Sequence, residues 1–270
     1  MKRILTAAVL VPLLIFIIGF ASSLFFTLLI GLASFLALEE FFRLARKSGI
    51  EVHRLWGHLF SLLLIASFHL WPRNQSVPFL LLGLSGIFLL ALGTRKGQSL
   101  HQIFPSPSAT LLGLAYIPSS LGLLVAVRSS TALGNDANRW ILFLLLVVWF
   151  GDTGAYYMGR ALGKHKLAPL ISPKKTFEGA IGGVLGNTVV ACLGKKILLS
   201  AIPLIQLLVL SWVLGVVSQI GDLAESALKR AAGVKDSSNL LPGHGGMLDR
   251  IDGLLFAAPV LFCYTKFFLK

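Results

Sequence analysis

The segment of residues 140–157, WILFLLLVVWFGDTGAYY, decides which class of fold the chain can adopt. Its first eleven residues are apolar, and Gly151 and Asp152 follow directly. A helix crosses a bilayer core with about 20 mainly apolar residues, so this segment is long enough to span a membrane. Asp152 is expected near the inner end of that span, because a carboxylate is costly deep in the hydrocarbon region.

The same apolar pattern recurs along the whole chain. Hydrophobic residues make up 56% of it and charged residues 13%, whereas a soluble domain carries about 25% charged residues. The sequence therefore predicts an all-α integral membrane protein with about nine transmembrane helices, one of them kinked at Pro118. The expected spans are 4–20, 22–38, 55–71, 77–93, 109–127, 140–157, 179–193, 204–224 and 252–268.

The distribution of Lys and Arg predicts the orientation of these helices. With the N-terminus inside, seventeen of the 24 Lys and Arg residues fall on the inner side. Positive residues favour the cytoplasmic side of a membrane. We therefore expect the N-terminus on the cytoplasmic side of the cytoplasmic membrane, and a polar cavity open to the cytoplasm. The scattered cations suit anionic lipid headgroups and argue against nucleic-acid binding. We expect about five spans in residues 1–139 and, in residues 140–270, a catalytic core of about four spans with two cytoplasmic loops.

Carboxylates gather at the inner ends of several spans. Asp222 and Glu225 stand three residues apart at the end of one expected helix, and Asp249 and Asp252 stand three apart at the start of the next. Residues at this spacing share a helix face, so separate helices bring carboxylates to the same depth. A cluster of like charges stays ionised only beside a cation. Oxygen ligands without paired Cys or His favour Mg²⁺ at Asp222, Asp249 and Asp252, with Asp152 as a fourth candidate.

Plainer interpretations exist for some of these acids. Asp249 and Asp252 suit the first turn of a helix, where the helix dipole stabilises a carboxylate. Glu225 suits an ion pair with Lys229 at the i,i+4 spacing, which leaves its role open.

Two further segments are candidates for phosphate binding. Lysines beside a helix N-terminus form an anion site, although the positive-inside bias alone would also place lysines there. Glycines present backbone N–H groups to phosphate oxygens, and they equally suit a plain turn. The candidates are Lys174, Lys175 and the expected N-cap Thr176 in the first segment, and His244, Gly245 and Gly246 in the second.

Two other features have structural interpretations. Glu39 and Glu40 follow the second span directly, and we interpret them as solvating a helix end in an inner loop of residues 39–54. Overlapping GxxxG pairs predict close helix packing, within the chain or between the subunits of a homodimer. The glycines of these pairs are Gly179, Gly182, Gly183 and Gly186.

Residues 226–252, SALKRAAGVKDSSNLLPGHGGMLDRID, resemble the signature of the phosphatidate cytidylyltransferase family, the CDP-diacylglycerol synthases. Every fixed position of this pattern is filled. Residues 172–179 (SPKKTFEG) and 152–156 (DTGAY) are also similar to the family, and the resemblance covers about residues 140–259. Gly253 departs from it, because relatives often carry Ser there.

The resemblance implies that CTP and phosphatidic acid react to give CDP-diacylglycerol and pyrophosphate, with Mg²⁺ and room for a second cation. The second pKa of a phosphomonoester is about 6, so the lipid phosphate is largely ionised near neutral pH and needs no strong base. The reaction needs alignment and neutralisation of the triphosphate charge instead. Beside the metal-binding aspartates, the resemblance implies catalytic roles for Lys229, Arg230 and Arg250, and phosphate binding by Lys174, Lys175, Thr176, Lys235, His244, Gly245 and Gly246.

Two alternatives compete with this interpretation. A polyprenol or dolichol kinase would transfer a phosphate from CTP to a lipid and release CDP. An ion transporter would hold its acidic residues near the bilayer midplane, whereas here they gather at one boundary.

Overall fold

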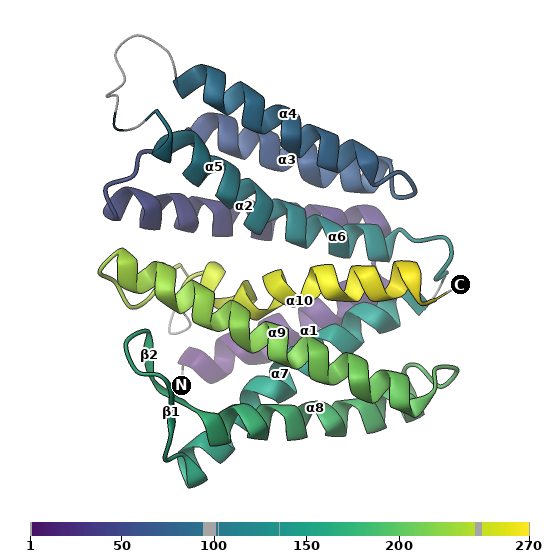
Figure 1. Cartoon of the computed structure of the whole chain (residues 1–270). Helices are drawn as coiled ribbons and strands as arrows, with labels where there is room; N and C mark the ends of the chain where they lie inside the picture. Colours follow the sequence, from purple (N-terminus) through teal and green to yellow (C-terminus); the bar gives the residue numbers. More distant parts are fainter. Residues whose placement is uncertain (1, 94–100, 102, 135, 241–244, 270) are drawn as a thin grey trace. The chain divides into compact units, whose positions relative to one another are not determined.

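The computed structural model describes residues 2–93, 101, 103–134, 136–240 and 245–269. Figure 1 shows the helices and the small hairpin that these residues form. The elements are α1 (Lys2–Phe20), α2 (Ser23–Lys47), α3 (Arg54–Leu70), α4 (Ser76–Gly93), α5 (Pro105–Tyr116), α6 (Pro118–Arg128), α7 (Asp136–Leu162), β1 (Lys166–Ala168), β2 (Ser172–Thr176), α8 (Phe177–Ile197), α9 (Leu204–Ala231) and α10 (Leu248–Phe267).

Five stretches within the described ranges are helical, long and apolar enough to cross a membrane. They are α2, α5 together with α6, α7, α8 and α9. Shorter apolar helices cover Val11–Phe20, Arg54–Leu70 and Ser76–Leu92. Every expected span overlaps a helix, so the predicted all-α membrane class is confirmed. The number of nine crossings and the inward N-terminus stay predictions.

The end of α2 differs from the expectation. An inner loop was predicted to begin at Glu39, but the helix continues to Lys47. Glu39 stabilises this extension, because its carboxylate is paired with Arg43 one turn later at 3.6 Å. It also accepts a 2.7 Å hydrogen bond from Arg54 and lies 3.1 Å from His58 of α3. The charged stretch is therefore a partnered helix face, and its interpretation as a solvated helix end was wrong.

Pro118 interrupts the expected fifth span. The ring has no N–H and clashes with the preceding turn, so a helix cannot continue through it unchanged. The structure ends α5 at Tyr116 and starts α6 at Pro118, the first helical position, where proline is well tolerated.

The chain divides into two compact units. Unit 1 contains Met1–Ser130 and Leu228–Arg250, and unit 2 contains Thr131–Ala227 and Ile251–Lys270. Unit 1 therefore includes α1 to α6 together with the end of α9 and the start of α10. The expected two-segment organisation did not include the return of Leu228–Arg250 to the N-terminal part of the chain.

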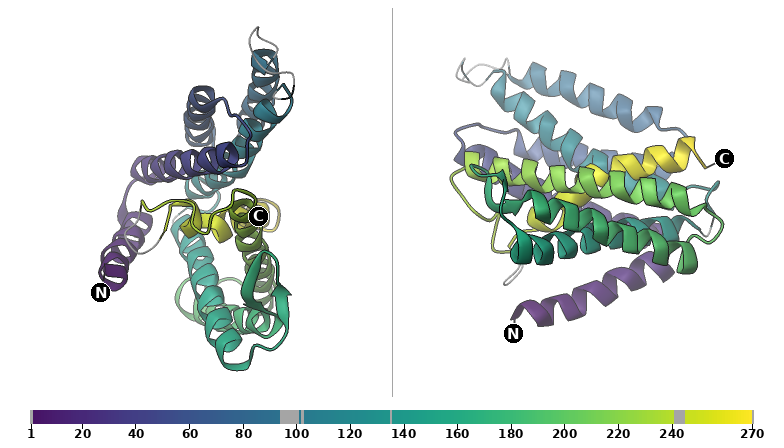
Figure 2. Two further views of the ribbon diagram at one scale, coloured as in Figure 1. Left: turned by 90° about the vertical axis from the view of Figure 1, so that its left-hand side faces the viewer. Right: turned by 60° about the horizontal axis from the view of Figure 1, so that its bottom comes forward.

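Helices α7 and α8 of unit 2 pack with their backbones in close approach, and Figures 1 and 2 show them side by side. A Cβ atom added to Gly154 would lie 2.3 Å from the carbonyl oxygen of Gly182. One added to Gly186 would lie 2.5 Å from the carbonyl oxygen of Phe150. These contacts confirm that the GxxxG glycines pack helices closely, and they do so within one chain.

A two-stranded antiparallel hairpin, which the sequence analysis did not predict, joins α7 to α8. Lys166 pairs with Thr176, and Ala168 pairs with Ser172. Pro173 is compatible with β2 because an edge strand leaves some of its N–H positions unused. The hairpin presents the two lysines of the SPKKT segment next to the start of α8.

Candidate active site

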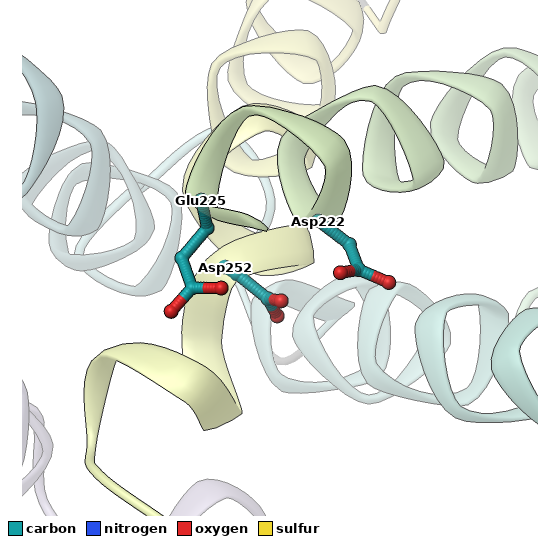
Figure 3. Close-up of side chains that lie close together, drawn as sticks. All are labelled: Asp222, Glu225 and Asp252. Carbon is teal, nitrogen blue, oxygen red and sulfur yellow. The ribbon is translucent and has the colours of Figure 1, made fainter. Parts of the chain in front are cut away.

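Three carboxylates of unit 2 meet where α9 and α10 approach each other. Asp222, Glu225 and Asp252 each offer an oxygen atom, and these oxygens lie within 4.8 Å of one another. Figure 3 shows the first two on neighbouring turns of α9 and the third on α10. Gly221 allows this approach, since a Cβ there would lie 2.6 Å from the carbonyl oxygen of Asp252. The predicted pair Asp222 and Asp252 is thus brought together, and Glu225 joins it.

The electrostatics of this cluster favour a cation. Glu225 is fully buried and the two aspartates are half-buried, so like charges lie close together in partly dehydrated surroundings. Such groups repel one another unless positive charge compensates them. Lys175 supplies one positive charge, with its Nζ 2.7 Å from Asp222 Oδ2. Hard carboxylate oxygens in this number fit Mg²⁺ or Ca²⁺ better than a softer metal.

A cavity of about 530 Å³ adjoins the cluster within unit 2. Asp152 of α7 and Asp222 of α9 both line it, together with Lys174 and Lys175 of the hairpin. Asp152, predicted as a fourth metal ligand, therefore belongs to the same cavity, although it is not one of the three clustered carboxylates. The polar lining residues are Asp152, Arg160, Lys174, Lys175, Thr176, Gln219 and Asp222.

The hairpin lysines are held in place at the N-terminus of α8. Thr176 is the N-cap as predicted, and its hydroxyl accepts a hydrogen bond of 3.1 Å from the Gly179 N–H. Glu178 in the first turn accepts hydrogen bonds from the Lys164 and His165 N–H groups at 3.1 and 3.3 Å. The segment that enters the hairpin is thereby tied to the helix start, and Lys174 and Lys175 of the hairpin line the cavity.

Asp249 belongs to unit 1, where it stabilises the loop before α10. Its Oδ1 atom lies 2.5 Å from Lys229 Nζ. Its Oδ2 atom accepts hydrogen bonds from the Ser237 N–H at 3.0 Å and the Gly246 N–H at 2.8 Å. Gly245 adopts a positive φ of 79° beside this carboxylate, a conformation that favours glycine. The N–H of Gly246, predicted to bind phosphate, is thus used to bind Asp249.

Unit 1 contains a second polar cavity, of about 510 Å³. Lys235, predicted to bind substrate phosphate, lines it beside Arg43 and Lys47 of α2. These two α2 cations were not predicted, because residues 39–54 were expected to form a loop remote from the signature. A sequence signal was available, since both fall on one face of the helix at the i,i+4 spacing.

The remaining predicted residues have separate positions. Arg230 donates a hydrogen bond of 3.0 Å to the carbonyl oxygen of Val234, in the segment that follows α9. Arg250 is exposed in the first turn of α10. His244 lies outside the described residues.

Carboxylates and lysines gathered beside a cavity in a helical membrane protein are typical of enzymes that act on phosphorylated substrates. The model of the cytidylyltransferase family matches residues 1–268. The chain therefore belongs to the cytidylyltransferase family, and it is a nucleotidyltransferase.

Bacterial relatives agree with this assignment. A phosphatidate cytidylyltransferase of Bacillus subtilis (strain 168) is 35% identical over 270 residues, which cover 99% of this chain and 98% of the relative. One of Brucella suis biovar 1 (strain 1330) is 38% identical over 276 residues, covering 99% and 94%. One of Staphylococcus saprophyticus is 43% identical over 158 residues, covering 58% of each chain.

Proposed function

We propose that this protein transfers CMP from CTP to phosphatidic acid, giving CDP-diacylglycerol and pyrophosphate. The names of the relatives support this substrate pair, and the carboxylate cluster of Asp222, Glu225 and Asp252 beside Lys175 is the observation that carries it. An ionised oxygen of the lipid phosphate attacks the α-phosphorus of CTP and forms a new P–O bond. The bond between the α-phosphorus and its bridging oxygen to the β-phosphate breaks, and pyrophosphate leaves.

The residues of unit 2 suit the needs of this reaction. Asp222, Glu225 and Asp252 would hold Mg²⁺, with Asp152 close by in the same cavity. Mg²⁺ bound there would neutralise charge on the triphosphate. Lys175 contributes positive charge for a phosphate group, and the cavity volume of about 530 Å³ falls within the usual range for small-molecule sites.

Unit 1 supplies the other proposed catalytic groups. Asp249 remains a proposed metal ligand. The Lys229 ammonium group is paired with its Oδ1 atom, at a position that a metal cation could take. Lys235 is proposed to bind phosphate together with Arg43 and Lys47, which line the same cavity. Arg230 and Arg250 stay proposed catalytic residues, and the family signature is their support.

The setting of the enzyme is part of the same proposal. We propose that it is a multi-pass protein of the inner membrane, with nine crossings, an inward N-terminus and an active site that faces the cytoplasm, where CTP is found. A second cation beside Mg²⁺ and a homodimer are further parts of it. The bacterial relatives and the apolar helices support the location.

Position-specific labelling of CTP tests the reaction. Purified protein in mixed micelles receives phosphatidic acid, Mg²⁺ and CTP labelled at either the α- or the γ-phosphate. We expect the α-label to enter the lipid phase and the γ-label to appear in pyrophosphate. A γ-label in the lipid would identify a lipid kinase instead. Ion flux across vesicles without CTP, together with no label in the lipid, would identify a transporter.

Lys175→Met is expected to lower kcat/KM for CTP by about 10- to 100-fold, because a charge-assisted hydrogen bond contributes about 1.5–3 kcal/mol. The side chain is half-buried beside Asp222, so the lost charge cannot be replaced easily by solvent. Steady-state kinetics with varied CTP measure the effect.

Lys195→Met is the matched control for this substitution. It removes a lysine from the end of α8 that lies away from the hairpin, where the ammonium group donates a hydrogen bond to the carbonyl oxygen of Ser200. We expect kcat/KM within about twofold of the wild type, as for most surface substitutions. Equal losses in both variants would contradict a specific role for Lys175.

A further inference from the structure

Glu40 of α2 is a buried carboxylate that the proposed reaction does not use. Its side chain is fully buried, and a buried charge is costly unless hydrogen bonds compensate it. Its Oε1 atom accepts hydrogen bonds from Ser238 Oγ at 2.6 Å and the Met247 N–H at 3.0 Å. Its Oε2 atom accepts from Ser237 Oγ at 2.9 Å and the Leu248 N–H at 2.8 Å. Four donors therefore surround one carboxylate.

These donors come from both sides of the segment that joins α9 to α10, which we call the signature loop because it lies within the signature of residues 226–252. Ser237 and Ser238 follow α9, whereas Met247 and Leu248 lie at the start of α10. One side chain of α2 thus joins two segments that are about ten residues apart in sequence, all within unit 1, through serine hydroxyls of the first and backbone N–H groups of the second. Because the carboxylate accepts backbone N–H groups directly, it constrains the path of the main chain and not only side-chain orientation.

Glu40 is also linked to Asp249 through a shared hydroxyl. Ser237 Oγ lies 2.9 Å from Glu40 Oε2 and 2.9 Å from Asp249 Oδ2. A serine hydroxyl carries one proton, so it donates to only one of the two carboxylates at a time. The hydrogen bonds of Glu40 and Asp249 are therefore coupled, and a change at Glu40 alters the surroundings of Asp249.

We propose that Glu40 is a positioning residue for the cytidylyltransferase reaction. It fastens both flanks of the signature loop to α2, so that Asp249, Lys229 and the Gly245–Gly246 turn keep the arrangement that catalysis needs. The inference rests on the proposed function, in which these signature residues act on the substrates. Misplacement of a catalytic group by about 1 Å can cost about 100-fold in rate.

Glu40→Gln tests the proposal with almost no change in shape. The amide replaces one acceptor oxygen by an NH₂ group, which then faces the N–H of either Met247 or Leu248. The serine hydroxyls can rotate to accept from an NH₂ group, whereas a backbone N–H cannot. We expect kcat to fall about 10- to 100-fold per folded molecule, with KM for CTP changed much less. Hydrogen–deuterium exchange of peptides covering residues 237–248 should become faster.

Glu39→Gln is the matched control. It removes the same charge from the adjacent residue, whose recorded partners are side chains of α2 and α3 and not the loop. We expect turnover within about twofold of the wild type and unchanged exchange in residues 237–248. Glu40→Asp keeps the charge but shortens the side chain, and it should show a smaller loss of kcat if Glu40→Gln does not fold.

The outcomes distinguish a failure of the positioning role of Glu40 from a failure of the proposed function. Wild-type kcat in Glu40→Gln, or faster exchange with kcat unchanged per folded molecule, would overturn the positioning role. Equal loss in Glu39→Gln would assign the effect to general charge removal and would overturn it as well. If the wild-type protein transfers no label from CTP to phosphatidic acid, the proposed function is refuted. The hydrogen–deuterium exchange measurement would still report whether Glu40 fastens the loop.

Discussion

Asp222→Asn should lower the rate of CMP transfer by about 1,000-fold or more, which corresponds to roughly 4 kcal/mol of transition-state stabilisation. Asp222 connects the carboxylate cluster of unit 2 with the hairpin lysine. Its carboxylate belongs to the cluster with Glu225 and Asp252, and it is also paired with Lys175 at 2.7 Å. Asparagine keeps the size but loses the anionic oxygen that a hard divalent cation requires.

Two measurements check this expectation independently. Transfer of the α-label of CTP to lipid reports activity, and electron paramagnetic resonance of added Mn²⁺ reports metal binding without turnover. Both should fall in Asp222→Asn. Asp136→Asn is the control, because that exposed acid at the start of α7 has a simple surface pair with Arg139 at 2.6 Å. More than about a tenth of wild-type activity in Asp222→Asn, with unchanged Mn²⁺ binding, would contradict the metal assignment.

Gly154→Ala is expected to destabilise the protein by about 1–3 kcal/mol, as overpacking of a close contact does. The new Cβ would lie 2.3 Å from the Gly182 carbonyl oxygen, and that atom is backbone, so it cannot rotate away. Helices α7 and α8 would have to separate. A stability loss of this size should lower the melting temperature in detergent by roughly 2–12 °C for a chain of this length.

Gly83→Ala provides a comparison in another helix. A Cβ at this position of α4 meets nothing within 4 Å, so the substitution adds helix propensity without a clash. Its melting temperature should equal or exceed that of the wild type. If Gly154→Ala were as stable as Gly83→Ala, the backbone contact between α7 and α8 would not be required.

The apolar helices could be predicted because hydrophobicity is local. An apolar run such as residues 140–150 predicts a membrane-spanning helix from its own composition, whichever helix it packs against. Helix ends were harder, because the last turns of α2 mix buried apolar residues such as Phe42 with charged ones such as Glu39, which is paired with Arg54. The hairpin was missed because SPKKT lacks the alternating apolar pattern that marks a strand.

The site was predictable as far as helix spacing reaches. The i,i+3 spacing placed Asp222 and Glu225 on one face, and the common depth of helix ends placed Asp252 near them. Spacing could not show that Asp249, three residues before Asp252, is bound by Lys229 and Ser237 in the other unit. Nor could it show that Glu40 is buried, because its partners are 197 to 208 residues away in the sequence.

The long sequence separation of those partners has a consequence for biosynthesis. Ribosomes add about 5–20 residues per second, so roughly 10–40 s pass between the synthesis of Glu40 and that of Leu248. During this interval the Glu40 carboxylate must stay hydrated or accept hydrogen bonds from other, temporary donors. Unit 1 can therefore be completed only late in translation, and a nascent chain stalled before Leu248 should expose the α2 carboxylate to water.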